Sequence, residues 1–93
     1  MITAIVLVDT AADRIPEAAA EIADLPDVTE VYSVTGDVDL VAVVRANRHE
    51  DLADAIADRI SKVPGVVRTR THIAFRTYSR HDLDQAFDLG LEG

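Results

Sequence analysis

The chain has 93 residues, which suffices for one domain with a single hydrophobic core. Apolar residues make up 48% of it, which excludes a disordered chain, and the absence of cysteine excludes disulfides and thiol chemistry. The net charge of −8 argues against nucleic acid as a direct partner, because that affinity comes mainly from basic side chains that release counterions from phosphates. A domain this small buries only about 60–65% of its unfolded surface, so we expect a protein partner to add stability.

The charge is unevenly divided along the chain. Residues 1–58 carry 13 acids and three arginines, whereas residues 59–78 carry five basic residues and no acid. The basic side chains of this segment either lie in water at a helix end and a strand edge, or they contact an acidic face of another copy of the chain. The N-terminus lacks the basic region of a signal peptide, and no apolar run approaches the ~20 residues of a membrane helix, so we expect a cytoplasmic protein without membrane contact.

The first third of the chain predicts a strand followed by a helix. Between Ile2 and Val8 the even-numbered residues are all apolar, and so are the odd-numbered Ile5 and Leu7. Apolar residues on both sides are typical of a strand covered on both faces. Thr10 and Asp13 are candidates to cap the helix that follows, Pro16 falls in its first turn and Pro26 ends it. The apolar stripe of this helix consists of Ile15, Ala18, Ala19 and Ile22.

The middle of the chain predicts a β-hairpin. Val28 to Thr35 is rich in β-branched and aromatic residues, and Leu40 to Val44 is wholly apolar, so we expect the second strand at 28–35 and the third at 40–45. A Gly-Asp pair between them is a strong turn signal. Gly36 adopts a positive φ at no steric cost and Asp37 tolerates one, so we expect a tight turn at these two residues.

The last part predicts a second helix and a long strand. Asn47, with Glu50 three residues later, has the pattern of a capping box at the helix start, and the Pro-Gly pair at 64–65 ends the helix. Val66 to Tyr78 predicts the fourth strand, and residues 79–93 a tail or short terminal helix. The expected buried stripe of the helix is Leu52, Ala53, Ile56, Ile60 and Val63.

This order of elements predicts an α+β, ferredoxin-like βαββαβ sandwich spanning residues 1–78, with residues 79–93 as a tail. Right-handed crossovers place both helices on one face of a four-stranded antiparallel sheet. The first and third strands are also apolar toward the other face, and a bare apolar sheet face exceeds what a soluble monomer tolerates. We therefore expect a two-fold dimer that pairs through that face.

Catalytic and metal chemistry find little support in the sequence. His49, His72 and His81 show no metal-ligand spacing, and no serine lies in a nucleophile elbow. The chain has no phosphate-cradling glycine-rich loop and too few aromatic residues for a cofactor stack. We therefore expect no catalytic residue, no cofactor and no metal.

Two pairs of polar residues are candidates for binding a zwitterion. Asp37 and Asp39, two positions apart, can lie on one side of an extended segment and bind an ammonium group. Thr69 and Thr71, with the same spacing on the fourth strand, can hold a carboxylate together with N–H groups of the turn. An α-amino acid offers both charges. The alternative is that these are ordinary turn and strand residues.

Three motifs together resemble the effector-binding (RAM) domain of the Lrp/AsnC transcriptional regulators. They are Val-Thr-Gly-Asp-Val-Asp-Leu at 34–40, Val-Pro-Gly-Val at 63–66 and Arg-Thr-Arg-Thr-His-Ile-Ala at 68–74, and the resemblance covers residues 2–77. It implies a ferredoxin-like domain that pairs through its sheets and assembles as dimers into rings of about eight, with amino acids bound between dimers. The implied ligand-binding residues are Val34, Gly36, Asp37, Asp39, Thr69 and Thr71.

One departure from the family bears on partners. Its members usually carry an N-terminal helix-turn-helix, whereas this chain starts directly at the first expected strand. It therefore resembles a stand-alone version, which would not bind DNA itself and would affect transcription by co-assembly with a full-length Lrp/AsnC regulator.

Two other functions stay open. Small dimeric α/β-barrel oxygenases and isomerases share this strand order. Five polar residues lie on one face of the expected fourth strand, where they would line an active site or a dimer face. These residues are Arg68, Arg70, His72, Arg76 and Tyr78. The third possibility is a structural adaptor, like the amino-acid-binding ACT modules but without a ligand.

Overall fold

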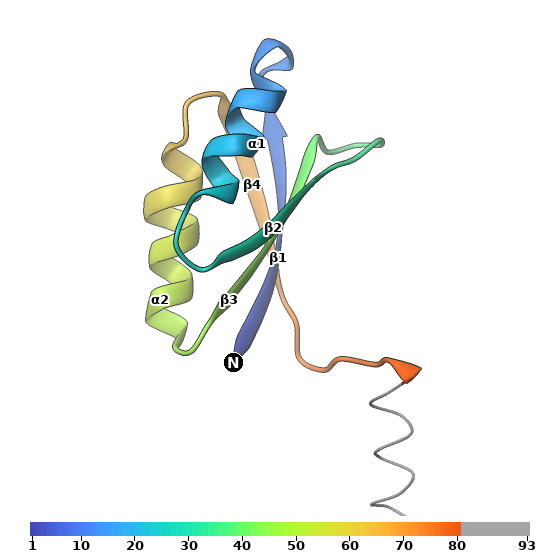
Figure 1. Ribbon diagram of the computed structural model, residues 1–93, viewed down its shortest axis with the longest axis vertical. Coiled ribbons are helices and arrows are strands. Elements are labelled where there is room, and N and C mark those ends of the chain that lie inside the picture. The colour runs from blue at the N-terminus through green and yellow to red at the C-terminus, as the bar shows by residue number, and fades with distance from the viewer. Residues whose placement is uncertain (81–93) are drawn as a thin grey trace, which may run out of the picture.

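The computed structural model describes residues 1–80 and forms a four-stranded antiparallel sheet with two helices on one face (Figure 1). The strand order β2-β3-β1-β4 confirms the predicted ferredoxin-like α+β fold. The elements are β1 (Ile2–Thr10), the 3₁₀ turn η1 (Ala12–Arg14), α1 (Ile15–Ala23), β2 (Val28–Ser33), β3 (Leu40–Ala46), α2 (His49–Ala53), the π-helical η2 (Asp54–Arg59), the 3₁₀ turn η3 (Ile60–Lys62) and β4 (Val66–Ile73). From residue 81 on, the predicted tail lies outside the described residues.

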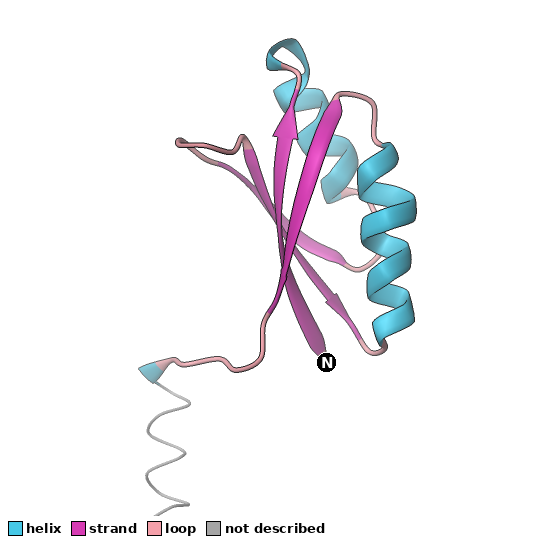
Figure 2. Ribbon diagram, turned by 180° about the vertical axis from the view of Figure 1, so that it is seen from behind, coloured by secondary structure: helices cyan, strands magenta, loops and turns pink. Residues whose placement is uncertain are grey.

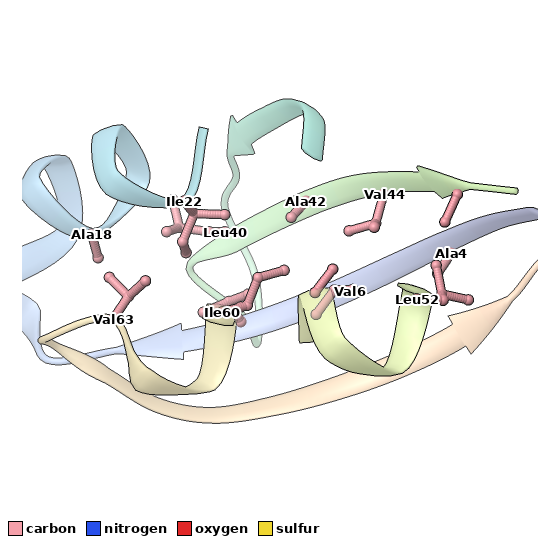
Figure 3. Packing of buried hydrophobic residues seen from close by; sticks show 13 residues of the cluster. Ala4, Val6, Ala18, Ile22, Leu40, Ala42, Val44, Leu52, Ile60 and Val63 are labelled. Atoms are coloured by element: carbon pink, nitrogen blue, oxygen red, sulfur yellow. The ribbon is translucent and has the colours of Figure 1, made fainter. Parts of the chain in front are cut away.

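The core fills the space between the helices and one face of the sheet (Figure 3). Alternate residues of β1 and β3 point into it, so that the register pairs Val6↔Ala42 and Val8↔Leu40 are fully buried. Burying each large side chain contributes about 1.5–3 kcal/mol. The cluster consists of Ala4, Val6, Val8, Ala18, Ile22, Leu40, Ala42, Val44, Ala46, Leu52, Ala55, Ile60 and Val63.

The predicted stripe of the first helix is confirmed, but the predicted helix caps are wrong. Pro16 lies in the first turn of α1, and Ala18 and Ile22 are fully buried. The N-cap of α1 is Arg14, with no side-chain cap hydrogen bond, because η1 intervenes between β1 and the helix. The N-cap of α2 is Arg48 rather than Asn47 and likewise has no side-chain cap bond.

The second helix continues from α2 through η2 and η3, and one residue of its predicted stripe is wrong. Ala53 is exposed, whereas Ala55 is fully buried. Ala55 follows Leu52 by three residues and so lies on the same face of the helix, whereas Ala53, only one residue after Leu52, is turned away from the sheet. No helix within residues 1–80 is long and apolar enough to cross a membrane.

The fourth strand is shorter than predicted. β4 ends at Ile73, which pairs with Ala4, and the Ala74 N–H still donates to the Thr3 carbonyl at 2.9 Å. Within the described chain β4 pairs with β1 alone, and β1 begins at Ile2, so beyond this point the chain has no strand to pair with. Residues 74–80 instead leave the sheet and extend away from the helices (Figures 1 and 2).

We call the sheet face turned away from the helices the open face. Register partners share a face, so the open face carries the residues paired with the odd-numbered residues of β1. Its middle is apolar, and a single chain leaves Ile5, Leu7 and Val41 only partly buried. The remaining residues of the face are Thr3, Asp9, Glu30, Tyr32, Val43, Arg45, Arg68, Arg70 and His72.

Candidate ligand site at the β2–β3 loop

The connection between β2 and β3 is a six-residue loop, 34–39, and not the predicted tight turn. The Val34 N–H donates to the Asp39 carbonyl at 3.1 Å and closes the loop at its base. Gly36 has a φ of +127°, as predicted, but Asp37 does not have a positive φ. Val38 is 9% exposed, so its burial draws the second half of the loop toward the sheet and lengthens the turn.

Asp39 ties the loop to the end of β1. Its Oδ2 accepts hydrogen bonds from the Thr10 backbone N–H at 2.9 Å and from the Thr10 hydroxyl at 3.4 Å. The Asp39 N–H donates to the Val8 carbonyl at 3.1 Å, which adds a backbone contact to the same strand. These bonds give Asp39 a partner within its own chain and fix the position of the loop.

Asp37 has a different environment from Asp39. Its side chain is 90% exposed, and its Oδ2 lies 4.0 Å from Nη2 of Arg70. At this distance and exposure the ion pair is weak. Asp37 therefore presents an accessible carboxylate on a loop that Asp39 holds in place. The two-residue spacing predicted that both acids could bind one group, but within the described chain they contact different residues: Asp39 contacts Thr10, and Asp37 lies near Arg70.

The two threonines lie on the other face of the sheet. Thr69 pairs with Val8 and Thr71 with Val6, so both belong to the helix side of β4, where Thr69 is half-buried and Thr71 exposed. Arg70, between them, pairs with Leu7 and belongs to the open face. Within one chain the loop and the two threonines therefore do not converge: Asp37 approaches Arg70 on the opposite face of β4.

The remaining predicted residues of the site belong to the loop itself. Val34 is half-buried and holds the loop base through its N–H, and Gly36 is exposed, with open space in the described structure where a Cβ would lie. Sequence reasoning missed Thr10, which it assigned to a helix cap, and missed Arg70 as the neighbour of Asp37. The β1–β3 register, which pairs Val8 with Leu40, is the signal that brings Thr10 next to Asp39.

A second charged cluster flanks the site on the open face. Nε and Nη2 of Arg68 donate to Asp9 Oδ2 at 3.1 and 3.0 Å across β1 and β4.

At the opposite sheet edge the Tyr32 hydroxyl donates to Glu30 Oε2 at 2.5 Å, and this bond to a carboxylate raises the pKa of Tyr32 above its usual 10.0.

The residues proposed for an enzymatic site are all exposed. His72 lies on the open face, opposite Ile5, and Arg76 and Tyr78 lie beyond the end of β4. The prediction that all residues from Arg68 to Tyr78 alternate between the two faces of one strand is therefore wrong after Ile73, where β4 ends. Among residues 1–80, no three His, Asp or Glu side chains are grouped to hold a metal ion.

Comparison with known proteins shows that the chain is similar to one domain of transcriptional regulators. The model of the Lrp/AsnC ligand binding domain matches residues 3–83. The HTH-type transcriptional regulator FL11 of Pyrococcus horikoshii is 37% identical over 75 residues, which make up 81% of this chain and 49% of FL11. The chain thus spans about half the length of that regulator.

Two solved structures extend this similarity. The structure of TTHA0845 from Thermus thermophilus superposes with a TM-score of 0.81 at 49% identity, covering 86% of this chain and 100% of that chain. The feast or famine regulatory protein of M. tuberculosis, complexed with L-methionine, superposes with a TM-score of 0.70 at 30% identity, covering 86% of this chain and 54% of that one. With its ferredoxin-like sheet and a family match over most of its length, the chain belongs to the Lrp/AsnC ligand-binding domain family.

Proposed function

We propose that the protein is a non-enzymatic amino-acid-binding and oligomerisation module that modulates a Lrp/AsnC-type transcriptional regulator without binding DNA itself. The observation that carries the proposal is the family match over residues 3–83, together with the relative that is complexed with L-methionine. The net charge of −8 supports the absence of direct DNA contact, because phosphate binding needs basic surface. A cytoplasmic location remains part of this proposal.

The ligand in this proposal is an α-amino acid held at the β2–β3 loop. The Asp37 carboxylate is 90% exposed, so it can accept charge-assisted hydrogen bonds from an ammonium group without first losing a strong partner. The hydroxyls of Thr69 and Thr71 and the N–H groups of the loop would bind the carboxylate. Because Asp37 and the threonines lie on different faces of β4, we infer that residues of two chains complete one site.

Self-association is the second part of the proposal. The apolar middle of the open face, with Ile5, Leu7 and Val41 only partly buried, supports pairing of two chains through this face. Such dimers would then assemble further, to about eight chains, with the loops at the contacts between dimers. A ligand that binds only the assembled form stabilises it by about 2.7 kcal/mol per site at a hundred times its Kd.

Titration calorimetry tests the ligand and its site. L-methionine and then the other proteinogenic amino acids are titrated into the wild type, Asp37→Ala and Thr71→Ala. We expect at least one amino acid to bind the wild type and to bind both variants at least tenfold more weakly, since each variant loses a hydrogen bond to a charged group. Asp54→Ala, which removes an exposed acid on η2, is the matched control and keeps the wild-type affinity. Unchanged affinity in both site variants would remove the proposed roles of these residues.

A further inference from the structure

Arg70 is a cation beside the candidate site that the proposed function does not use. It lies on the open face, where it pairs with Leu7 of β1, and its side chain is 43% exposed. Within residues 1–80 its ion pair is the contact of its Nη2 with Oδ2 of Asp37, at 4.0 Å. More than half of this side chain is therefore covered by the protein, while its guanidinium group is held only loosely.

The neighbouring Arg68 shows the contrast with a guanidinium that is fully engaged. Its Nε and Nη2 both donate to Asp9 Oδ2, at 3.1 and 3.0 Å. Arg70 follows two residues later on the same face of β4. Charge-assisted N–H···O bonds are about 2.7–2.9 Å long, so the contact at 4.0 Å leaves the N–H groups of Arg70 available to another acceptor.

The fold, and not this weak ion pair, brings Asp37 to Arg70. The loop that carries Asp37 follows β2, which lies at the opposite edge of the sheet from β4. Figures 1 and 2 show the loop extending away from the two helices. The hydrogen bonds between Asp39 and Thr10 hold the loop there. A carboxylate and a guanidinium group from distant parts of the chain are thus held near each other on one side of the sheet.

A ligand that binds Asp37 through its ammonium group takes the place of Arg70 as the partner of this carboxylate. A ligand with an uncharged side chain offers Arg70 no anion in return, whereas a second carboxylate on the ligand does. A guanidinium group binds a carboxylate through two parallel N–H···O bonds. The partial burial of Arg70 strengthens such a pair, because fewer water molecules screen it. An acidic ligand therefore leaves both charged residues paired.

We propose that Arg70 determines the specificity of the site, and that its ligand is an amino acid with a carboxylate in the side chain, as in aspartate and glutamate. The proposal rests on the amino-acid binding of the proposed function and names the class of ligand. Asp37 binds the ammonium group, the hydroxyls of Thr69 and Thr71 bind the α-carboxylate, and Arg70 binds the side-chain carboxylate.

Titration calorimetry with matched pairs of ligands tests the ligand class. Glutamate and glutamine have nearly the same shape and differ in charge, as do aspartate and asparagine, so the ratio of the two affinities isolates the side-chain carboxylate. We expect the wild type to bind at least one of the acids roughly 10- to 100-fold more tightly than its amide, since hydrogen bonds between two charged groups are the strong ones.

Substitutions of the two neighbouring arginines test the residue. Arg70→Met keeps an apolar side chain beside Leu7 and removes the charge, so it should bring the ratio of acid to amide affinity close to one. Arg68→Met makes the same change on the same face and is the matched control, which should keep the wild-type ratio. Arg70→Glu should reverse the preference toward lysine or arginine as ligand. Each variant loses an exposed ion pair, so circular dichroism and the urea midpoint should remain those of a folded protein.

The outcomes separate this inference from the proposed function. If an amino acid binds in a manner that depends on Asp37, but neither acid binds more tightly than its amide, the ligand class is overturned and the proposed function stands. The same holds for the role of Arg70 if Arg70→Met keeps the wild-type ratio. A wild type that binds none of the twenty amino acids would instead overturn the proposed function, and the specificity of Arg70 with it.

Discussion

The Asp39 carboxylate accepts two hydrogen bonds from Thr10, one from its backbone N–H at 2.9 Å and one from its hydroxyl at 3.4 Å. This contact joins the β2–β3 loop to the end of β1, 29 residues away in the sequence. It separates two acids that the sequence presents as a pair: Asp39 positions the loop, and Asp37 is left accessible on it.

Asp39→Ala should destabilise the fold by about 1–3 kcal/mol, because it leaves the Thr10 N–H without its partner. Asp39→Asn keeps an amide oxygen that can accept the same bond, so it should cost less than half as much. Urea denaturation at fixed protein concentration measures both variants. Equal losses for Ala and Asn would mean that the negative charge, and not the hydrogen bond to Thr10, stabilises the loop.

Gly65→Ala should be among the most damaging single changes outside the core. Gly65 has a φ of +99°, and an added Cβ would lie 2.6 Å from the Cβ of Arg14, closer than real Cβ atoms approach. Gly36→Ala is the matched control, because Gly36 has a φ of +127° but an added Cβ there would lie in open space within the described structure. We expect a loss of about 1–2 kcal/mol at Gly36 from backbone strain alone, and a clearly larger loss at Gly65.

Thermal and urea denaturation of the two glycine variants give the comparison. Adding Arg14→Gly to Gly65→Ala removes the colliding Cβ and should recover the steric part of the loss, leaving the part caused by φ. If the Gly36 and Gly65 variants lose the same stability, the close contact with Arg14 has no energetic weight.

The pKa of Tyr32 should fall toward its usual value in Glu30→Gln. The hydrogen bond to the Glu30 carboxylate is the main cause of the raised pKa, and the charge of Glu30 adds to it. A raised pKa in the folded state means that this contact stabilises the fold below the unfolded pKa of 10.0, and that the stabilisation is lost as the pH rises through the folded value. Tyrosinate absorbance in a Tyr78→Phe background reports Tyr32 alone. An identical titration with and without Glu30→Gln would show that the bond does not form in solution.

Local patterns were sufficient for most of the fold. The apolar spacing that ends at Ile22 and the alternation through Val6 and Val8 predict the helix and strand because burial against the sheet repeats with the period of each element. The end of β4 at Ile73 was not predictable from its own residues, since strand-favouring residues such as Phe75, Thr77 and Tyr78 continue beyond it. It is decided by where β1 begins, which is a distant part of the chain.

The candidate site was only partly predictable, for a similar reason. Gly36 and the exposed Asp37 follow from turn chemistry, but the partner of Asp39 depends on the register between β1 and β3. The two-residue spacing of Thr69 and Thr71 places them on one face, as expected, yet only the sheet order reveals that this face is turned away from Arg70 and Asp37. In the proposed function a second chain completes the site, and the contacts between two chains cannot be worked out from the residue spacing of one.

Sedimentation velocity of the wild type, alone and with each of the twenty amino acids, tests most directly whether this domain couples ligand binding to assembly. We predict dimers or larger species in the absence of ligand, a shift of the distribution with at least one amino acid, and no such shift in Asp37→Ala. A monomer that none of the twenty amino acids changes would contradict the account.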